Sequence, residues 1–157
     1  RSVGLVLGMT VRDNITMSNL SQYCRHSWIR HKEEKRVADE QIREFSIKTP
    51  SAEQIAANLS GGNQQKIVLS KTLLCQPEVI ILDEPTRGID VGAKAEIHKM
   101  ISALASQGKG IIMISSEMPE ILGMSDRIIV IHEGRKKGEL LRENASQQAI
   151  MEMMLAQ

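Results

Sequence analysis

Residues 79–85 read VIILDEP, and this stretch decides the fold that the sequence predicts. Its first four residues form an apolar run that suits a buried strand and falls far below the ~20 residues of a membrane span. Two carboxylates, Asp83 and Glu84, follow directly and so lie at the carboxyl end of the predicted strand. Open α/β sheets bind ligands at that end of their parallel strands. The stretch therefore predicts a parallel sheet with a ligand site beside two acids.

The sequence around this stretch alternates between helical and extended patterns. We expect strands at 79–82, 110–115 and 127–131, and a turn at 133–134 that leads into a short further strand. Helices are expected at 62–75, 93–106, 119–122 and 146–156. Apolar strands that alternate with helices are typical of a mostly parallel sheet covered on both faces.

The first part of the chain follows a mostly helical pattern. A helix that begins at Thr10 or Asp13 carries apolar residues as far as Leu20. Residues 29–45 place a narrow apolar stripe among dense mixed charge, which predicts a solvated helix. Pro50 breaks this pattern. We therefore expect one domain at 1–57, a helical subdomain with its entry segment, and a second at 58–157.

The composition argues against several classes of function. Lys and Arg number 20 and Asp and Glu number 19, whereas nucleic-acid binders usually carry a basic excess on one face. Aromatic residues make up only 2% of the chain, too few for base-stacking platforms. Cys24 and Cys75 form no CxxC motif and share no metal-ligand spacing with the four histidines. We expect no nucleic-acid partner, no secretory signal and a reducing, cytosolic compartment.

A second motif, NLSGGNQQK at 58–66, has the residues of a phosphate-binding loop. Ser60 supplies a hydroxyl, and the glycines at 61–62 let the backbone approach phosphate oxygens closely. The N-terminus of the following helix adds a dipole equivalent to roughly half a positive charge. The motif that would hold the rest of a nucleotide, G-x-x-x-x-G-K-[ST], is absent from these 157 residues. The only Gly-Lys pair, 108–109, has Ala103 where the first glycine would stand.

The two acids at 83–84 suit the chemistry of phosphate transfer. Asp83 is placed to hold Mg²⁺ directly or through water, because Mg²⁺ prefers oxygen ligands. Glu84 can polarise a water molecule aimed at a γ-phosphate, and a positioned base of this kind contributes roughly 10²–10⁴-fold to a rate. From these residues alone, a pair of solvated acids at a strand end stays open as the alternative.

Three stretches together closely resemble the motifs of the ATP-binding cassette (ABC) family. LSGG resembles its signature, VIILDEP its Walker B strand, and TRGID at 86–90 its D-loop. The finer resemblance is to the second cassette of two-cassette ribose, galactose and xylose importers. It is carried by LSGGNQQK, LDEPTRGIDVGAK, ISSEMPEILGMSDRIIV and HEG, and it covers nearly the whole chain. It implies an α/β fold: a partial P-loop NTPase core with a mostly parallel sheet, plus a helical subdomain. The second domain would hold the signature helix, Walker B, the D-loop and the C-terminal part of the RecA-like core, with the phosphate loop upstream of Arg1.

The resemblance also implies a role for each matching residue. The nucleotide-binding residues would lie in the signature loop and the D-loop: Ser60, Gly61, Gly62, Asn63, Gln64 and Asp90. The signature residues would contact a γ-phosphate bound mainly by a facing cassette. Asp83 would serve Mg²⁺, Glu84 would act on the attacking water, and Asp90 would couple two sites across a dimer. Residues near the loop or the dimer interface would include Gln65, Arg87 and Lys94, although plain surface charge is the alternative for Lys94.

One position departs from the common pattern of the family. Most cassettes place a histidine at the end of the next strand, where this chain has Ser116 within ISSE at 114–117. Serine cannot take a positive charge. Related second cassettes share this SSE sequence, which suggests that the catalytic site of Glu84 is slow or mainly structural. Glu117 as a substitute base is the alternative.

The resemblance implies that the function is ATP hydrolysis coupled to monosaccharide import. ATP and Mg²⁺ would be the cofactors. The subunit would be cytoplasmic and peripheral on the inner face of the plasma membrane, with a facing cassette, a permease and indirectly a sugar-binding protein as partners. Without a phosphate loop we expect these residues alone to be inactive, and an open strand edge predicts self-association. Two alternatives stay open. One is a non-catalytic dimerisation module that lends its LSGG loop; the other is the C-terminal half of a DNA-repair-type ATPase.

Overall fold

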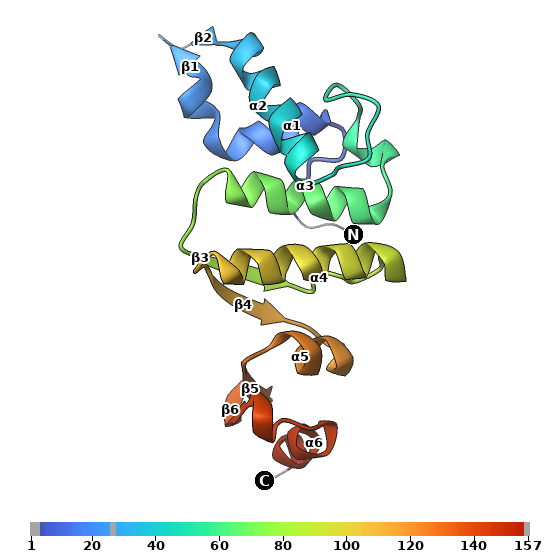
Figure 1. Ribbon diagram of the computed structural model, residues 1–157, viewed down its shortest axis with the longest axis vertical. Helices are drawn as coiled ribbons and strands as arrows, with labels where there is room; N and C mark the ends of the chain where they lie inside the picture. The colour runs from blue at the N-terminus through green and yellow to red at the C-terminus, as the bar shows by residue number, and fades with distance from the viewer. Residues whose placement is uncertain (1–3, 26–27, 156–157) are drawn as a thin grey trace. The chain divides into compact units, whose positions relative to one another are not determined.

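The structure is a computed structural model that describes residues 4–25 and 28–155. Contacts divide the chain into two compact units, and Figure 1 shows the elements that make up each. The first unit consists of Arg1–Ile80 with Thr86–Gly110, and the second of Ile81–Pro85 with Ile111–Gln157. The domain boundary near residue 57 stays a prediction.

The first unit is built mainly from four α-helices: α1 (Val11–Thr16), α2 (His31–Glu44), α3 (Gly61–Leu73) and α4 (Val91–Ser106). Helix α1 packs against α2 and α3, and α3 lies beside α4 (Figure 1). Short 3₁₀ helices follow α1 and precede α3, at Met17–Tyr23 (η1) and Ala56–Asn58 (η2). The apolar stripes of these helices form the core, whose side chains with no exposed surface include Val11, Ile15, Ala38, Ile67 and Ile97.

Two details of this unit refine the sequence prediction. The Thr10 hydroxyl caps α1 by accepting a hydrogen bond from the Asp13 N–H at 3.1 Å, so Thr10 is the cap and Asp13 lies inside the helix. The helix predicted at 29–45 begins two residues late, because Ile29 belongs to a strand. Strand β2 (Trp28–Ile29) pairs antiparallel with β1 (Cys24–Arg25), and this pairing takes the backbone hydrogen bonds that a helix would have used.

The predicted strand at 79–82 forms β3 (Val79–Asp83), which neighbours β4 (Gly110–Ile114). The Gly110 N–H donates to the Glu78 carbonyl at 2.9 Å, and the Glu84 N–H donates to the Ile114 carbonyl at 2.8 Å. The two strands therefore run in the same direction, as predicted. Both acids follow the apolar part of β3.

The second unit also contains a hairpin and two α-helices. Strand β5 (Arg127–His132) pairs antiparallel with β6 (Arg135–Leu141). Glu133 and Gly134 connect them with φ of 50° and 74°, which confirms the predicted turn. The unit is completed by helix α5 (Met118–Met124), the 3₁₀ helix η3 (Arg142–Asn144) and helix α6 (Gln147–Leu155). The helix predicted at 146–156 corresponds to α6, and its last residue, Ala156, lies outside the described residues. Ile128, Val130 and Ile150 form its buried apolar cluster.

The α/β prediction is confirmed, but one face of the strands is open. Side chains alternate between buried and exposed along β3, and Ile81 is 66% exposed. On β4, Ile112 and Ile114 are 51% and 52% exposed. The prediction that both faces are covered was wrong for this chain, because none of the described elements buries these side chains. Within residues 4–25 and 28–155, no helix has both the length and the apolar character needed to cross a bilayer.

Candidate functional site

The signature loop leads directly into α3, with Ser60 as the residue before its first turn. Serine at this position usually accepts a hydrogen bond from a first-turn N–H. The Ser60 hydroxyl does not do so. Instead, its Oγ accepts a hydrogen bond from Asn63 Nδ2 at 2.9 Å, and Asn63 Oδ1 accepts one from the Lys48 N–H at 2.8 Å. The hydroxyl is thus held by a side chain of α3 and not by the helix backbone.

Both signature glycines lie close to neighbouring segments. A Cβ added to Gly62 would lie 2.6 Å from the Cβ of Ala93 in α4, a separation that real contacts do not show. A Cβ on Gly61 would lie 3.3 Å from Cγ2 of Ile89, in the predicted D-loop. Packing within the first unit therefore accounts for the absence of a side chain at Gly62. It also brings the signature loop against the D-loop.

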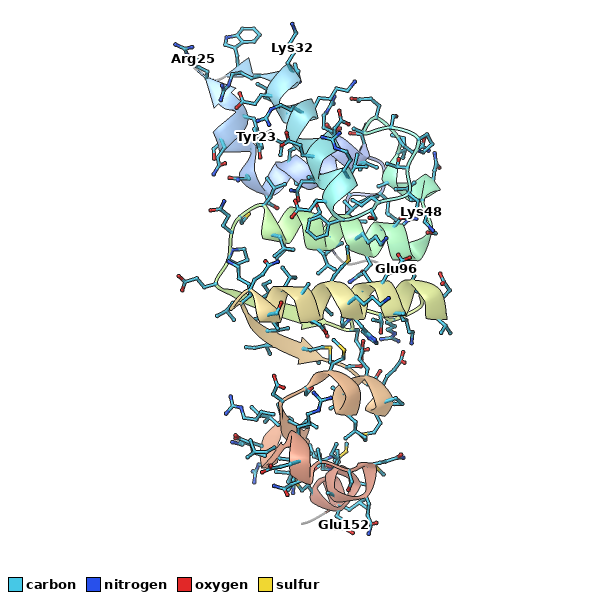
Figure 2. All side chains as sticks on the ribbon, in the orientation of Figure 1. Tyr23, Arg25, Lys32, Lys48, Glu96 and Glu152 are labelled. Atoms are coloured by element: carbon cyan, nitrogen blue, oxygen red, sulfur yellow. The ribbon has the colours of Figure 1, made fainter. Side chains whose placement is uncertain are left out.

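An open pocket of about 200 Å³ lies where α3 and α4 both begin. Its lining includes four of the predicted nucleotide-binding residues, namely Ser60, Gly62, Asn63 and Asp90. Figure 2 labels Lys48 and Glu96, which also line this pocket. The N-terminus of α3 presents partial positive charge at this opening, which suits an anionic ligand. The N-terminus of α4 is already met by the carboxylate of Asp90.

Asp90 has a structural role at this pocket. Its carboxylate caps α4 by accepting a hydrogen bond from the Ala93 N–H at 2.9 Å. The acid also complements the dipole of the helix that it caps. Gln64, in contrast, does not line the pocket. Its Nε2 donates to the carbonyls of Ala56 and Leu59, each at 3.1 Å. Gln64 therefore stabilises the backbone that leads into the signature loop.

An ion pair between a buried lysine and a half-exposed glutamate lies at the pocket and was missed by the sequence analysis. Lys66 is only 3% exposed, and its Nζ lies 2.7 Å from Glu96 Oε2 and donates to the Ser46 carbonyl at 2.9 Å. This side-chain hydrogen bond from Lys66 lowers the pKa of Glu96 below its ordinary value. Lys66 therefore connects α3 with α4 and with the loop after α2. A lysine on the inner face of a helix is the one signal that could have indicated it.

The predicted catalytic residues lie together in the second unit. Glu84 has a φ of 48°, in the left-handed region that residues other than glycine rarely adopt. Its Oε1 accepts a hydrogen bond from the Ser116 N–H at 2.9 Å. The structure thus brings the Glu84 carboxylate next to the backbone of Ser116. Ser116 contributes its backbone to this contact and not its hydroxyl.

Asp83 is exposed at the end of β3. Within the described ranges, no group of three or more His, Cys, Asp or Glu side chains is arranged to hold a metal ion. Proteins often bind Mg²⁺ through one or two carboxylates, with substrate phosphates and water as the other ligands. A single exposed carboxylate fits that kind of ligand set. Arg87, predicted near the dimer interface, is also exposed, and Glu117 is half-buried at the start of α5.

Comparisons with known proteins show the family of the chain. The ABC transporter family model matches residues 2–87, which is more than half of the chain. The chain belongs to the ABC transporter family. A relative from Clostridium perfringens strain 13, the ribose import ATP-binding protein RbsA, is 52% identical over 151 residues. That alignment covers 96% of this ABC transporter chain and 30% of the relative, so the chain spans less than a third of that protein's length.

Solved ABC cassettes share the fold of the chain. MJ1267, an ATP-binding cassette of an ABC transporter, matches with a TM-score of 0.77 and 20% identity, over 99% of this chain and 66% of MJ1267. The cassette MJ0796, solved as a dimer in a post-hydrolysis state with ADP and Pi, matches with a TM-score of 0.71 and 21% identity. That match covers 88% of this chain and 59% of MJ0796. At these identities the likeness shows the fold alone.

Proposed function

We propose that this chain is part of the ATP-binding subunit of a monosaccharide importer, in which it supplies the signature half of a composite nucleotide site. The observation that carries the proposal is the single pocket that contains Ser60, Asn63 and Asp90 at the start of two helices. The relative at 52% identity, a ribose import protein, supports the substrate class. Residues 1–57 would form the helical subdomain of the cassette, and 58–157 the signature helix with the later part of the core.

In this proposal the signature loop acts on a nucleotide that another cassette holds. The Ser60 hydroxyl and the N-terminus of α3 would stabilise the γ-phosphate, and Gly61 would let the backbone approach it. The dimeric form of MJ0796 with ADP and Pi supports a site shared between two cassettes. Asp90, as the cap of α4 in the same pocket, would couple the two nucleotide sites across the dimer.

Asp83 and Glu84 would serve a nucleotide of the chain's own cassette. Bound Mg²⁺ would supply charge neutralisation at the phosphates, with Asp83 as one of its oxygen ligands. Glu84 would orient a water molecule as a general base, held in place by the Ser116 N–H. These residues have no phosphate loop within the 157 residues of the chain. We therefore infer that this chain alone does not hydrolyse ATP.

The other partners follow from the same proposal. A facing cassette would complete the nucleotide site, and a membrane permease supplied by a sugar-binding protein would receive the conformational change. The chain would then lie on the cytoplasmic face of the plasma membrane. A non-catalytic module that lends only its signature loop is the second candidate, and serine at position 116, where most cassettes have histidine, favours it.

MgATP-dependent association tests the proposal. The chain is mixed with a cassette that carries an intact phosphate loop, and binding is measured with ATP, with ADP and without nucleotide. We expect association only with ATP, because only ATP presents a γ-phosphate to Ser60. Ser60→Arg should abolish the association by filling the position of that phosphate. Equal binding with ADP, or undiminished binding of the arginine variant, would contradict the proposal.

A further inference from the structure

We infer that Asn63 is a positioning residue that fixes the Ser60 hydroxyl as an outward-pointing hydrogen-bond donor. The inference rests on the proposed function for the identity of the ligand, a phosphate oxygen. It assigns Asn63 a different role from the direct nucleotide contact that the family resemblance implies. Asn63 acts through Ser60, and Ser60 makes the contact.

The orientation of the Asn63 carboxamide follows from its neighbours. A backbone N–H can only donate, so the atom 2.8 Å from the Lys48 nitrogen must be the carboxamide oxygen. The other end of the group is then the NH₂, which can only donate. It lies 2.9 Å from Ser60 Oγ. Ser60 Oγ must therefore accept this hydrogen bond.

A serine hydroxyl has one hydrogen and two lone pairs. Since Asn63 occupies one lone pair of Ser60, the hydroxyl hydrogen cannot point toward Asn63. The hydroxyl does not cap α3, and a cap would use its second lone pair and leave its hydrogen free. Its hydrogen remains available to an acceptor in the pocket that Ser60 lines. A phosphate oxygen is such an acceptor, and the N-terminus of α3 at this pocket favours its negative charge.

Lys48 anchors this arrangement from outside α3. Its backbone N–H belongs to the loop whose Ser46 carbonyl is held by Lys66. The loop is thus tied to α3 at two points, by Lys66 and by Asn63. The Lys48 backbone N–H requires an acceptor at one end of the side chain at position 63. The Ser60 oxygen requires a donor at the other end. Among side chains of this size, asparagine provides both.

Asn63→Asp tests the donor end while preserving size and shape. A carboxylate can still accept from the Lys48 N–H, but it cannot donate to Ser60. The Ser60 hydroxyl would then donate to the carboxylate and its hydrogen would be lost to the ligand. Asn58→Asp is the matched control, since it makes the same chemical change at an exposed position two residues before Ser60. It adds the same charge near the pocket without touching the hydroxyl.

The first measurement needs no ligand. Solvent exchange of the Asn63 side-chain amide protons is followed by NMR in the wild-type chain and in Ser60→Ala. We expect exchange to be about 2- to 10-fold faster in Ser60→Ala, because the hydrogen bond is lost, while the Lys48 amide is unchanged. Equal exchange of the Asn63 amide in both proteins overturns the inference.

The second measurement is the MgATP-dependent affinity of the chain for a cassette that carries a phosphate loop. We expect Asn63→Asp to weaken it about tenfold or more, and Asn58→Asp about twofold or less. In a Ser60→Ala background, Asn63→Asp should cost no more than Asn58→Asp does. An undiminished effect of Asn63→Asp in that background overturns the inference.

The two measurements separate the inference from the proposed function. If the wild-type chain shows no MgATP-dependent association, the proposed function fails. The amide exchange then still decides whether Asn63 orients Ser60. If association occurs but the Asn63 amide is unprotected, the proposed function stands and the inference fails.

Discussion

The carboxylate of Glu84 accepts a hydrogen bond from the backbone N–H of Ser116 at 2.9 Å. Glu84 follows β3 with a positive φ, and Ser116 follows β4 two residues after Ile114, whose carbonyl accepts from the Glu84 N–H. The two strand ends are thus joined through both the backbone and the side chain of Glu84. The contact needs no particular side chain at position 116.

This relationship predicts how substitutions at Glu84 and Ser116 affect stability. Glu84→Gln keeps an oxygen acceptor and should lower the free energy of unfolding by less than about 0.5 kcal/mol. Glu84→Met keeps the length of the side chain without the acceptor and should cost about 0.5–1.5 kcal/mol. Ser116→Ala should be nearly neutral, because the backbone makes the contact. Urea denaturation measures all three, and an alanine variant as unstable as Glu84→Met would show that the hydroxyl matters.

Gly62 and Gly123 form a second, matched comparison. Gly62→Ala should destabilise the chain by about 1–3 kcal/mol, because the new Cβ would lie 2.6 Å from the Ala93 Cβ. Gly123, inside α5, has no atom within 4 Å of an added Cβ, so Gly123→Ala should stabilise the chain by up to about 1 kcal/mol. Thermal and urea unfolding test both. Equal effects of the two substitutions would rule out the packing explanation for Gly62.

The ion pair of Lys66 and Glu96 predicts a pH dependence of stability. Because the hydrogen bond from Lys66 lowers the pKa of Glu96, the folded state binds this proton more weakly than the unfolded state does. Glu96 therefore contributes stability above its ordinary pKa of 4.5, and this contribution is lost as the pH falls through the lowered value.

Glu96→Gln measures that contribution, since the amide oxygen can still accept from Lys66. We expect the difference in unfolding free energy between the wild-type chain and Glu96→Gln to be constant above pH 6 or so and to shrink as the solution is acidified below 4.5. Urea denaturation across this range provides the measurement. A difference that grows on acidification would have the wrong sign for this mechanism.

The open face of β3 and β4 predicts self-association of the isolated chain. Ile81 and Ile112 are more than half exposed, and apolar strands with unpaired edges tend to pair with other copies. Ile112→Lys should reduce the association constant in sedimentation velocity. Leu155→Lys makes a comparable change at an exposed residue of α6 and serves as the control. A monomeric wild-type chain would refute the prediction.

The parts of the fold that the sequence could predict depend on local patterns. The VIILDEP strand, the turn at 133–134 and the cap by Thr10 each follow from a few adjacent residues. The start of the helix at 29–45 could not be placed, because Ile29 pairs with Cys24 in a short hairpin that overrides the helical pattern. Propensity alone cannot decide such a competition.

The candidate site shows the same division. Two sequence motifs indicated the site residues directly: NLSGGNQQK indicated Ser60, and VIILDEP indicated Asp83 and Glu84. The contacts that hold these side chains depend on tertiary packing. Lys66 ends the NLSGGNQQK motif and pairs with Glu96 thirty residues along the chain, but the motif does not indicate this partner. The role of Asn63 likewise depends on a backbone N–H in a loop fifteen residues upstream. No local pattern indicates contacts of this kind.

The most direct test of the central claim is ATP turnover in a mixture of this chain with a cassette that carries a phosphate loop. The chain should act in trans through its signature loop, so Ser60→Arg should abolish the turnover that the wild-type chain restores. Glu84→Gln should leave this turnover largely intact, because Glu84 has no phosphate loop beside it in these residues. Turnover by the chain alone, or turnover that is lost with Glu84→Gln and kept with Ser60→Arg, would contradict the claim.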